Sequence, residues 1–133
     1  MFMLNIEDSK LKIKELAEKY NLSLVVLFGS QATGAVHTKS DVDIAALGAN
    51  SLDRFALAND LDKVFERNDV EVIDMNGASP TMMYVLVRDG KLLYENTIGA
   101  FMKWKFYAIR EWINTAWLRK LSDKKLIEWA RVV

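Results

Sequence analysis

Two kinds of hydrophobic pattern alternate along the chain. Short apolar or alternating runs, typical of strands, occupy residues 24–28, 41–47, 70–75 and 91–95. Segments with apolar residues every three or four positions, typical of amphipathic helices, lie between these runs and fill residues 97–133. Because helices separate the strands, the pattern predicts an α/β (α+β) fold, with helices packed against a small mixed sheet. The short link between the first two strands predicts that they pair antiparallel.

Capping residues suggest where several helices begin. Ser79-Pro80 is a strong start signal, because serine caps the helix and proline suits its first position. Asp8 and Ser9 are expected to cap the first helix, Ser51 a helix over 52–67, and Ser122-Asp123 a last short helix. The core-facing stripe of the first helix is predicted at four positions, with Ile13 off the stripe: Leu11, Leu16, Ala17 and Tyr20.

Composition narrows the class of protein. The chain has 133 residues, which predicts one domain, with a core over 4–95 and a helical C-terminal segment over 97–133. Its 18 basic and 18 acidic residues balance, which argues against direct binding of nucleic acid. It has no cysteine and one histidine, His37, which excludes thiolate metal sites and sites that need two imidazoles. With no membrane span or signal peptide apparent, we expect a cytoplasmic protein.

Two aspartates stand one residue apart in the second predicted strand. Side chains alternate along a strand, so Asp41 and Asp43 share a face, while Val42 and Ile44 point into the core. At ~4 Å and an effective dielectric of about 20, two carboxylates repel by roughly 4 kcal/mol. A shared proton or a divalent cation would offset this repulsion. An all-oxygen site completed by phosphate oxygens suits Mg²⁺.

A third carboxylate would complete such a site. Glu71 lies at the start of the next predicted strand, and Asp74 lies on the opposite face of the same strand. Glu71 is the preferred candidate and Asp74 the alternative. Three carboxylates around two cations ~3.5–4 Å apart are the usual arrangement for in-line displacement at phosphorus.

A glycine-serine pair ends the first predicted strand. Gly29 allows the backbone to approach a phosphate closely, and Ser30 begins a short helical turn whose N–H groups favour an anion. A phosphate cradle beside metal-binding carboxylates implies a nucleoside triphosphate as the substrate.

The stretch GSQATGAVHTKSDVD, Gly-Ser-x10-Asp-x-Asp, resembles the motif of the polymerase-β-like nucleotidyltransferases. Together with VEVIDMNGASP, it is similar to their minimal members, the MNT or MntA type. The resemblance implies that Gly29 and Ser30 hold the triphosphate of ATP and that Asp41, Asp43 and Glu71 bind Mg²⁺. Many relatives carry arginine at the position of Thr33, and Lys39 is the expected source of a cation here.

The same resemblance implies a partner. Many such proteins pair with a HEPN-domain ribonuclease toxin and act as its antitoxin by transferring AMP from ATP to a toxin tyrosine. Two alternatives remain open. The chain could neutralise its partner by binding alone, or it could transfer a nucleotide to a small molecule or to RNA.

The C-terminal segment carries two apolar stripes. One comprises Phe101, Trp104, Ala108 and Trp112, and the other runs from Met102 through Phe106, Ile109 and Ile113 to Trp117. The first interpretation is that one stripe packs on the sheet while Leu126, Ile127 and Trp129 of the last helix cover the other. The second is a protein interface, for the toxin or for a homo-oligomer.

Overall fold

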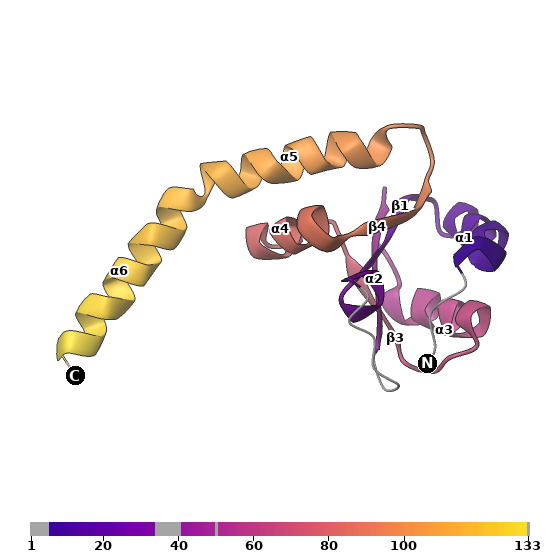
Figure 1. Cartoon of the computed structure of the whole chain (residues 1–133), viewed down its shortest axis with the longest axis horizontal. Coiled ribbons are helices and arrows are strands. Elements are labelled where there is room, and N and C mark those ends of the chain that lie inside the picture. Colours follow the sequence, from indigo (N-terminus) through magenta and orange to yellow (C-terminus); the bar gives the residue numbers. More distant parts are fainter. Residues whose placement is uncertain (1–5, 34–40, 50, 133) are drawn as a thin grey trace.

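A computed structural model describes residues 6–33, 41–49 and 51–132 (Figure 1). Six helices and four strands follow one another in these ranges: α1 (Ile6–Lys19), β1 (Leu22–Phe28), α2 (Ser30–Thr33), β2 (Val42–Gly48), α3 (Arg54–Phe65), β3 (Val70–Asp74), α4 (Pro80–Asp89), β4 (Lys91–Glu95), α5 (Ala100–Asn114) and α6 (Ala116–Val132).

The four strands form one mixed sheet in the order β3-β2-β1-β4. β1 pairs antiparallel with both β2 and β4, and β2 pairs parallel with β3. The predicted fold class and the predicted antiparallel pairing of the first two strands are therefore confirmed. The parallel pair arises because α3 carries the chain back across the sheet between β2 and β3.

Each face of the sheet has its own hydrophobic core. On one face, Val42 and Ile44 pack with residues of α1 and α3, including Ile13 and Leu61. On the other face, residues of β1 and β2 pack with α4 and α5, through Met83, Leu86, Phe101 and Trp104. Figure 1 shows α1 and α3 on one side of the strands and α4 and α5 on the other. Both faces of the sheet are therefore covered by helices.

The first helix uses a different stripe from the predicted one. Ile13 is 1% exposed, whereas Leu11 is 68% exposed. Ser9, Ile13 and Ala17, four residues apart, form the buried row, and Leu16 and Tyr20 border it. The helix also begins at Ile6, so Asp8 and Ser9 lie inside it and do not cap it.

Besides the caps of α1, the predicted cap is right at α4 and wrong at α3 and α6. The Ser79 side chain accepts a hydrogen bond of 3.1 Å from the N–H of Met82, with Pro80 in the first turn. At α3 the cap is Asp53, whose carboxylate accepts from Ala56 N–H at 3.1 Å, and Ser51 lies before the helix. Ser122 lies inside α6, which begins at Ala116.

The last two helices extend away from the sheet. α5 packs on α4, and α6 continues from α5 at an angle and points away from the other elements (Figure 1). Phe101, Trp104 and Ala108 are buried, but the second stripe of α5 is exposed, as are Leu126, Ile127 and Trp129. The interpretation in which the last helix covers that stripe is therefore wrong, since α6 projects instead of folding back.

None of the helices within the described residues is both long and apolar enough to span a membrane.

Candidate functional site

Three of the predicted site residues lie at one end of the sheet. Asp43 is opposite Glu71 in the parallel pair β2–β3 and opposite Phe28 at the end of β1. Asp41 precedes β2 and shares the strand face of Asp43 by its two-residue spacing. Their neighbours Val42, Val70 and Val72 belong to the core on the α1–α3 face. The carboxylates therefore lie on the α4–α5 face, where β1 ends and β2 and β3 begin.

Asp43 is under electrostatic strain in this arrangement. Its side chain is half-buried, and burial raises the pKa of its carboxyl above the ordinary value. The negative charges of Glu71, Asp41 and Asp69 raise that pKa further, in this order of size. A group of like charges around a partly buried carboxylate is the situation that a bound cation relieves.

Gly29 lies directly against Asp43. Its φ is +74°, in the left-handed region, and a Cβ at this position would meet the Asp43 carboxylate and lie 3.3 Å from its Cγ. The amides of Ala32 and Thr33 donate to the Gly29 carbonyl, both at 3.1 Å, and this closes the turn into α2. Glycine is thus required twice, for the backbone conformation and for the space beside the carboxylate.

Asp74, the alternative third carboxylate, lies elsewhere. It is at the far end of β3, opposite Ala46, and on the face of Val70 and Val72. Its carboxylate accepts the backbone N–H of Asn76 at 2.9 Å, within the turn that follows the strand. The geometry therefore separates Asp74 from Asp41 and Asp43 and favours Glu71.

Lys39 and His37 lie outside the described residues, as does the connector that contains them. Ser30 begins α2, so it follows Gly29 at the site. The role of each predicted site residue stays a prediction.

An ion pair that the sequence does not predict lies close to the carboxylates. Arg67 donates to Asp69 through two hydrogen bonds of 2.7 Å each, and this bidentate geometry fixes the guanidinium. The hydrogen bonds with Asp69 raise the pKa of Arg67, and the charge of Asp41 also raises it. A fixed positive charge thus borders the acidic group. An arginine in a loop after a helix gives no sequence signal for such a role.

Gln31 was also missed. It is 5% exposed, and its Nε2 has no hydrogen-bond partner in the part of the chain that the structure describes. A buried amide without a partner is uncommon and marks a position that a later contact can satisfy.

The donor atoms at the site bear on whether it fits a metal ion. Among the described residues, no three acidic or imidazole side chains are already gathered into a metal-binding group. Asp41, Asp43 and Glu71 nonetheless offer only carboxylate oxygens, the donors that Mg²⁺ prefers. The charges of Glu71 and Asp41 both raise the pKa of the Asp43 carboxyl. The residues therefore fit a hard divalent cation by charge and by donor type.

The site motif and the sheet that carries it match a known family. Residues 11–98 match the family described as "Polymerase beta, Nucleotidyltransferase", which is more than half of the chain. The chain belongs to this nucleotidyltransferase family. The matched region contains Gly29, Ser30, Asp41, Asp43 and Glu71 and ends just before α5.

Two curated relatives are described as protein adenylyltransferase MntA. The one from Aphanizomenon flos-aquae is 29% identical over 132 residues, covering 90% of this chain and 86% of the relative. The one from Shewanella oneidensis is 40% identical over 76 residues, which is 55% of this chain and 54% of the relative. The predicted resemblance of this nucleotidyltransferase to the MntA type is confirmed.

Solved structures extend the likeness to the whole fold. A crystal structure of a toxin-antitoxin with AMP-PNP superposes with a TM-score of 0.74 and 28% identity, over 89% of this chain and 98% of that chain. A tri-AMPylated Shewanella oneidensis HEPN toxin in complex with MNT antitoxin gives 0.71 and 26%, over 92% of this chain and 98% of that one. The predicted polymerase-β-like fold with a helical C-terminal extension is confirmed.

Proposed function

We propose that this nucleotidyltransferase transfers AMP from ATP to a tyrosine hydroxyl of a HEPN-domain toxin and thereby acts as its antitoxin. The observation that carries the proposal is the register of the sheet, which places Glu71 opposite Asp43 and Gly29 against the same carboxylate. The MntA relatives and the toxin-antitoxin complexes, one with AMP-PNP and one with a tri-AMPylated toxin, support it.

Each site residue has a defined task in this proposal. Gly29 and Ser30 hold the triphosphate in the turn between β1 and α2, and Lys39 supplies a positive charge to it. Asp41, Asp43 and Glu71 would hold Mg²⁺, whose positive charge would offset the repulsion among the three carboxylates.

 When bound there, Mg²⁺ would neutralise charge on the phosphates and would lower the pKa of an attacking hydroxyl.

The reaction is an in-line displacement at the α-phosphorus. The tyrosine oxygen forms the new O–P bond, the bond from the α-phosphorus to the bridging oxygen of the β-phosphate breaks, and pyrophosphate leaves. Asp43 or Glu71 accepts the proton of the tyrosine hydroxyl, since both carboxylates lie at the site.

The experiment follows the transfer of label from α-labelled ATP to the purified toxin. We expect Asp41→Asn combined with Asp43→Asn to abolish labelling, and we expect chelation of Mg²⁺ to do the same in the unaltered chain. Mass spectrometry then identifies the labelled residue. Undiminished labelling by the double variant would refute the mechanism.

A matched pair on β3 tests the third carboxylate. Glu71→Gln should reduce labelling by at least about a hundredfold, because transition-state charge loses several kcal/mol of stabilisation. Asp74→Asn alters the same strand on its opposite face, so it should leave labelling within about twofold. The reverse ranking would assign the role to Asp74.

Neutralisation by binding alone is the second candidate, and the exposed apolar surface of α5 and α6 favours a tight complex. The double variant separates the two in cells that express the toxin. If catalysis is required, the cells die with the variant and grow with the unaltered chain. Growth with the variant would show that binding suffices.

A further inference from the structure

The surface that remains unexplained is the arm, which we define as α5 and α6 together (residues 100–132). Phe101, Trp104 and Ala108 bury one side of α5. The opposite side carries an apolar stripe at the spacing of one helix face, and its members are between 41% and 67% exposed: Met102, Phe106, Ile109 and Ile113. A helix that is apolar on both sides has a second surface to cover.

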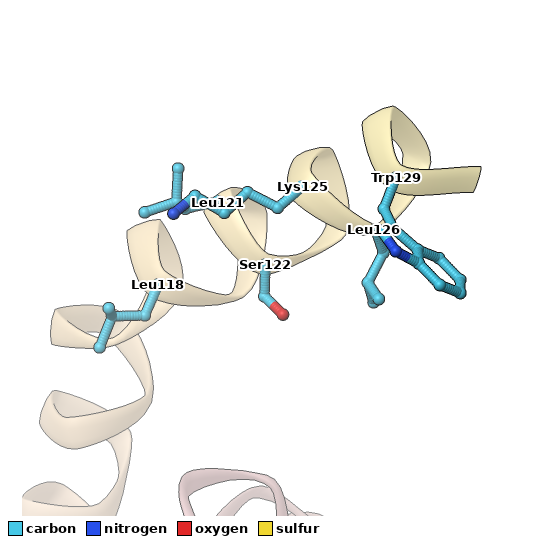
Figure 2. A pocket seen from close by; sticks show the side chains of 6 residues that line it. All are labelled: Leu118, Leu121, Ser122, Lys125, Leu126 and Trp129. Carbon is cyan, nitrogen blue, oxygen red and sulfur yellow. The ribbon is translucent and has the colours of Figure 1, made fainter. Parts of the chain in front are cut away.

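α6 continues this apolar surface. Leu118, Leu121, Leu126 and Trp129 line an open pocket along the helix, together with Ser122 and Lys125 (Figure 2). These residues recur at intervals of three and four positions, so they share one side of α6. α6 packs closely on α5 alone among the described elements, and this pocket therefore stays open.

The bend between the two helices is held by specific contacts. Arg119 donates to the Thr115 hydroxyl and to the Trp112 carbonyl, both at 2.8 Å, and its guanidinium lies 3.4 Å from the centre of the Trp112 ring. Trp112 in turn stacks on Tyr84 of α4, with 4.8 Å between ring centroids. The arm is thus fastened to the sheet domain in a defined direction, which lowers the entropic cost of binding a partner.

The arm and the rest of the chain also differ in net charge. Residues 100–132 contain eight basic and three acidic side chains, a net charge of +5, so residues 1–99 carry −5 in a chain with 18 of each. On α5, Lys103 and Arg110 stand one heptad apart at the edge of the stripe, and both are exposed. An apolar surface with a basic border fits a partner surface that is apolar with an acidic border.

We propose that the arm is the docking surface for the acceptor protein and that it recognises an apolar patch bordered by carboxylates on that protein. This rests on the proposed function, in which the acceptor is the toxin. The toxin-antitoxin structures superpose over 89% and 92% of this chain, whereas residues 1–99 are about three quarters of it, so their fold includes part of the arm. Docking outside the active site would add acceptor recognition to the chemistry at the carboxylate end of the sheet.

Two other occupants fit the surface less well. A second copy that paired arm to arm would bring two charges of +5 together, which electrostatics opposes. Single-stranded RNA binds through aromatic rings on which bases stack, but three of the four stripe residues of α5 are aliphatic: Met102, Ile109 and Ile113.

The experiment measures the affinity of the purified cognate toxin by titration calorimetry and the rate of AMP transfer at increasing toxin concentration. We expect Phe106→Ala combined with Ile113→Ala to raise the Kd and the KM for toxin by at least about tenfold. The kcat at saturating toxin should stay within about twofold, because neither residue lies at the carboxylates. Both side chains are exposed, so thermal unfolding should be unchanged.

Matched variants control for the loss of an exposed ring and for the reversal of a charge elsewhere on the surface. Phe55→Ala removes a ring that is 79% exposed on α3, on the other face of the sheet, and should leave the Kd unchanged. Lys103→Glu should weaken binding, and more strongly at low salt, whereas Lys14→Glu on α1 should not. Equal affinities for the arm variants and their controls would overturn the proposal.

The remaining outcomes separate the two proposals. Wild-type transfer of AMP with no effect of the arm variants would refute the docking surface and leave the proposed function intact. No transfer by the unaltered chain would refute the proposed function, while the calorimetry would still test the arm. A dimer of the chain alone that Phe106→Ala with Ile113→Ala dissociates would assign the surface to a second copy. Binding of a labelled single-stranded RNA that Lys103→Glu abolishes, with toxin affinity unchanged, would assign it to RNA.

Discussion

At the scale of the residue, the proposed reaction needs the ionised carboxylate of Asp43, but the same ionised group destabilises the fold. Burial and the neighbouring carboxylates raise the pKa of Asp43, so its ionised form is disfavoured in the folded state. Above this raised pKa the ionised carboxylate destabilises the fold, and the destabilisation fades as the pH falls through it. Active sites commonly hold such unfavourable groups because the reaction needs them.

We therefore predict that Asp43→Asn stabilises the protein and inactivates it. The midpoint of thermal unfolding should rise at neutral pH, and the gain over the unaltered chain should shrink as the pH is lowered. Labelling of the toxin should fall at least about a hundredfold. Calorimetric melting curves across a pH series, with the labelling assay beside them, check both effects; a lower melting temperature at neutral pH would contradict the electrostatic argument.

Gly29 and Gly77 offer a controlled comparison. Both have positive φ, +74° and +82°, but a Cβ at Gly29 would meet the Asp43 carboxylate, whereas at Gly77 it would meet nothing within 4 Å. Gly77→Ala should lower stability by about 1–2 kcal/mol through backbone strain alone and keep full activity. Gly29→Ala should lose activity as well. Urea unfolding and labelling of both variants distinguish strain from displacement of Asp43; equal activities would show that the space beside the carboxylate is unimportant.

The residues of the site differ in how far the sequence could reveal them. Asp41 and Asp43 are two apart on a strand, so their common face follows from local geometry. Glu71 depends on the parallel register of β2 and β3, which no local pattern specifies, and so Asp74 stayed open as an alternative. Arg67 and Asp69 meet through the conformation of a loop, which leaves no periodic signal.

At the scale of the element, tertiary contacts determine where a helix begins and which of its faces is buried when the local sequence allows more than one answer. Serine and aspartate both cap helices well, and Ser51 is the cap predicted for α3 from the sequence, whereas the structure uses Asp53. The structure begins α3 at Arg54, where its buried residues Leu57 and Leu61 reach the core. The same selection applies to α1, whose buried row is set by packing against α3 and β1.

The two candidate caps of α3 give a direct test. Asp53→Ala removes the acceptor of the Ala56 N–H and should cost about 1 kcal/mol of unfolding free energy. Ser51→Ala should change the free energy by less than about 0.5 kcal/mol, because the residue lies outside the helix. Chemical denaturation of the two variants measures the difference, and a larger loss for Ser51→Ala would place the helix start where the sequence suggested it.

At the scale of the whole molecule, the arm and the sheet domain contribute differently to folding. The sheet domain contains both hydrophobic cores, and the buried side of α5 completes one of them. α6 has no buried side chain within the described residues, so its apolar residues add little to the stability of the isolated chain. The sequence alone shows that these residues of α6 are apolar. Only the direction of α6 shows that they are exposed.

Two tryptophans test whether the buried side of α5 stabilises the fold while α6 contributes little to stability. Trp104 is 8% exposed in the core beneath α5, so Trp104→Ala should cost about 3–5 kcal/mol of unfolding free energy. Trp129 is 67% exposed on α6, so Trp129→Ala should change it by less than about 0.5 kcal/mol. If α6 serves recognition, Trp129→Ala should nevertheless weaken toxin binding in the calorimetric titration. A large loss of stability with unchanged binding would instead mean that α6 folds back on the sheet domain in solution.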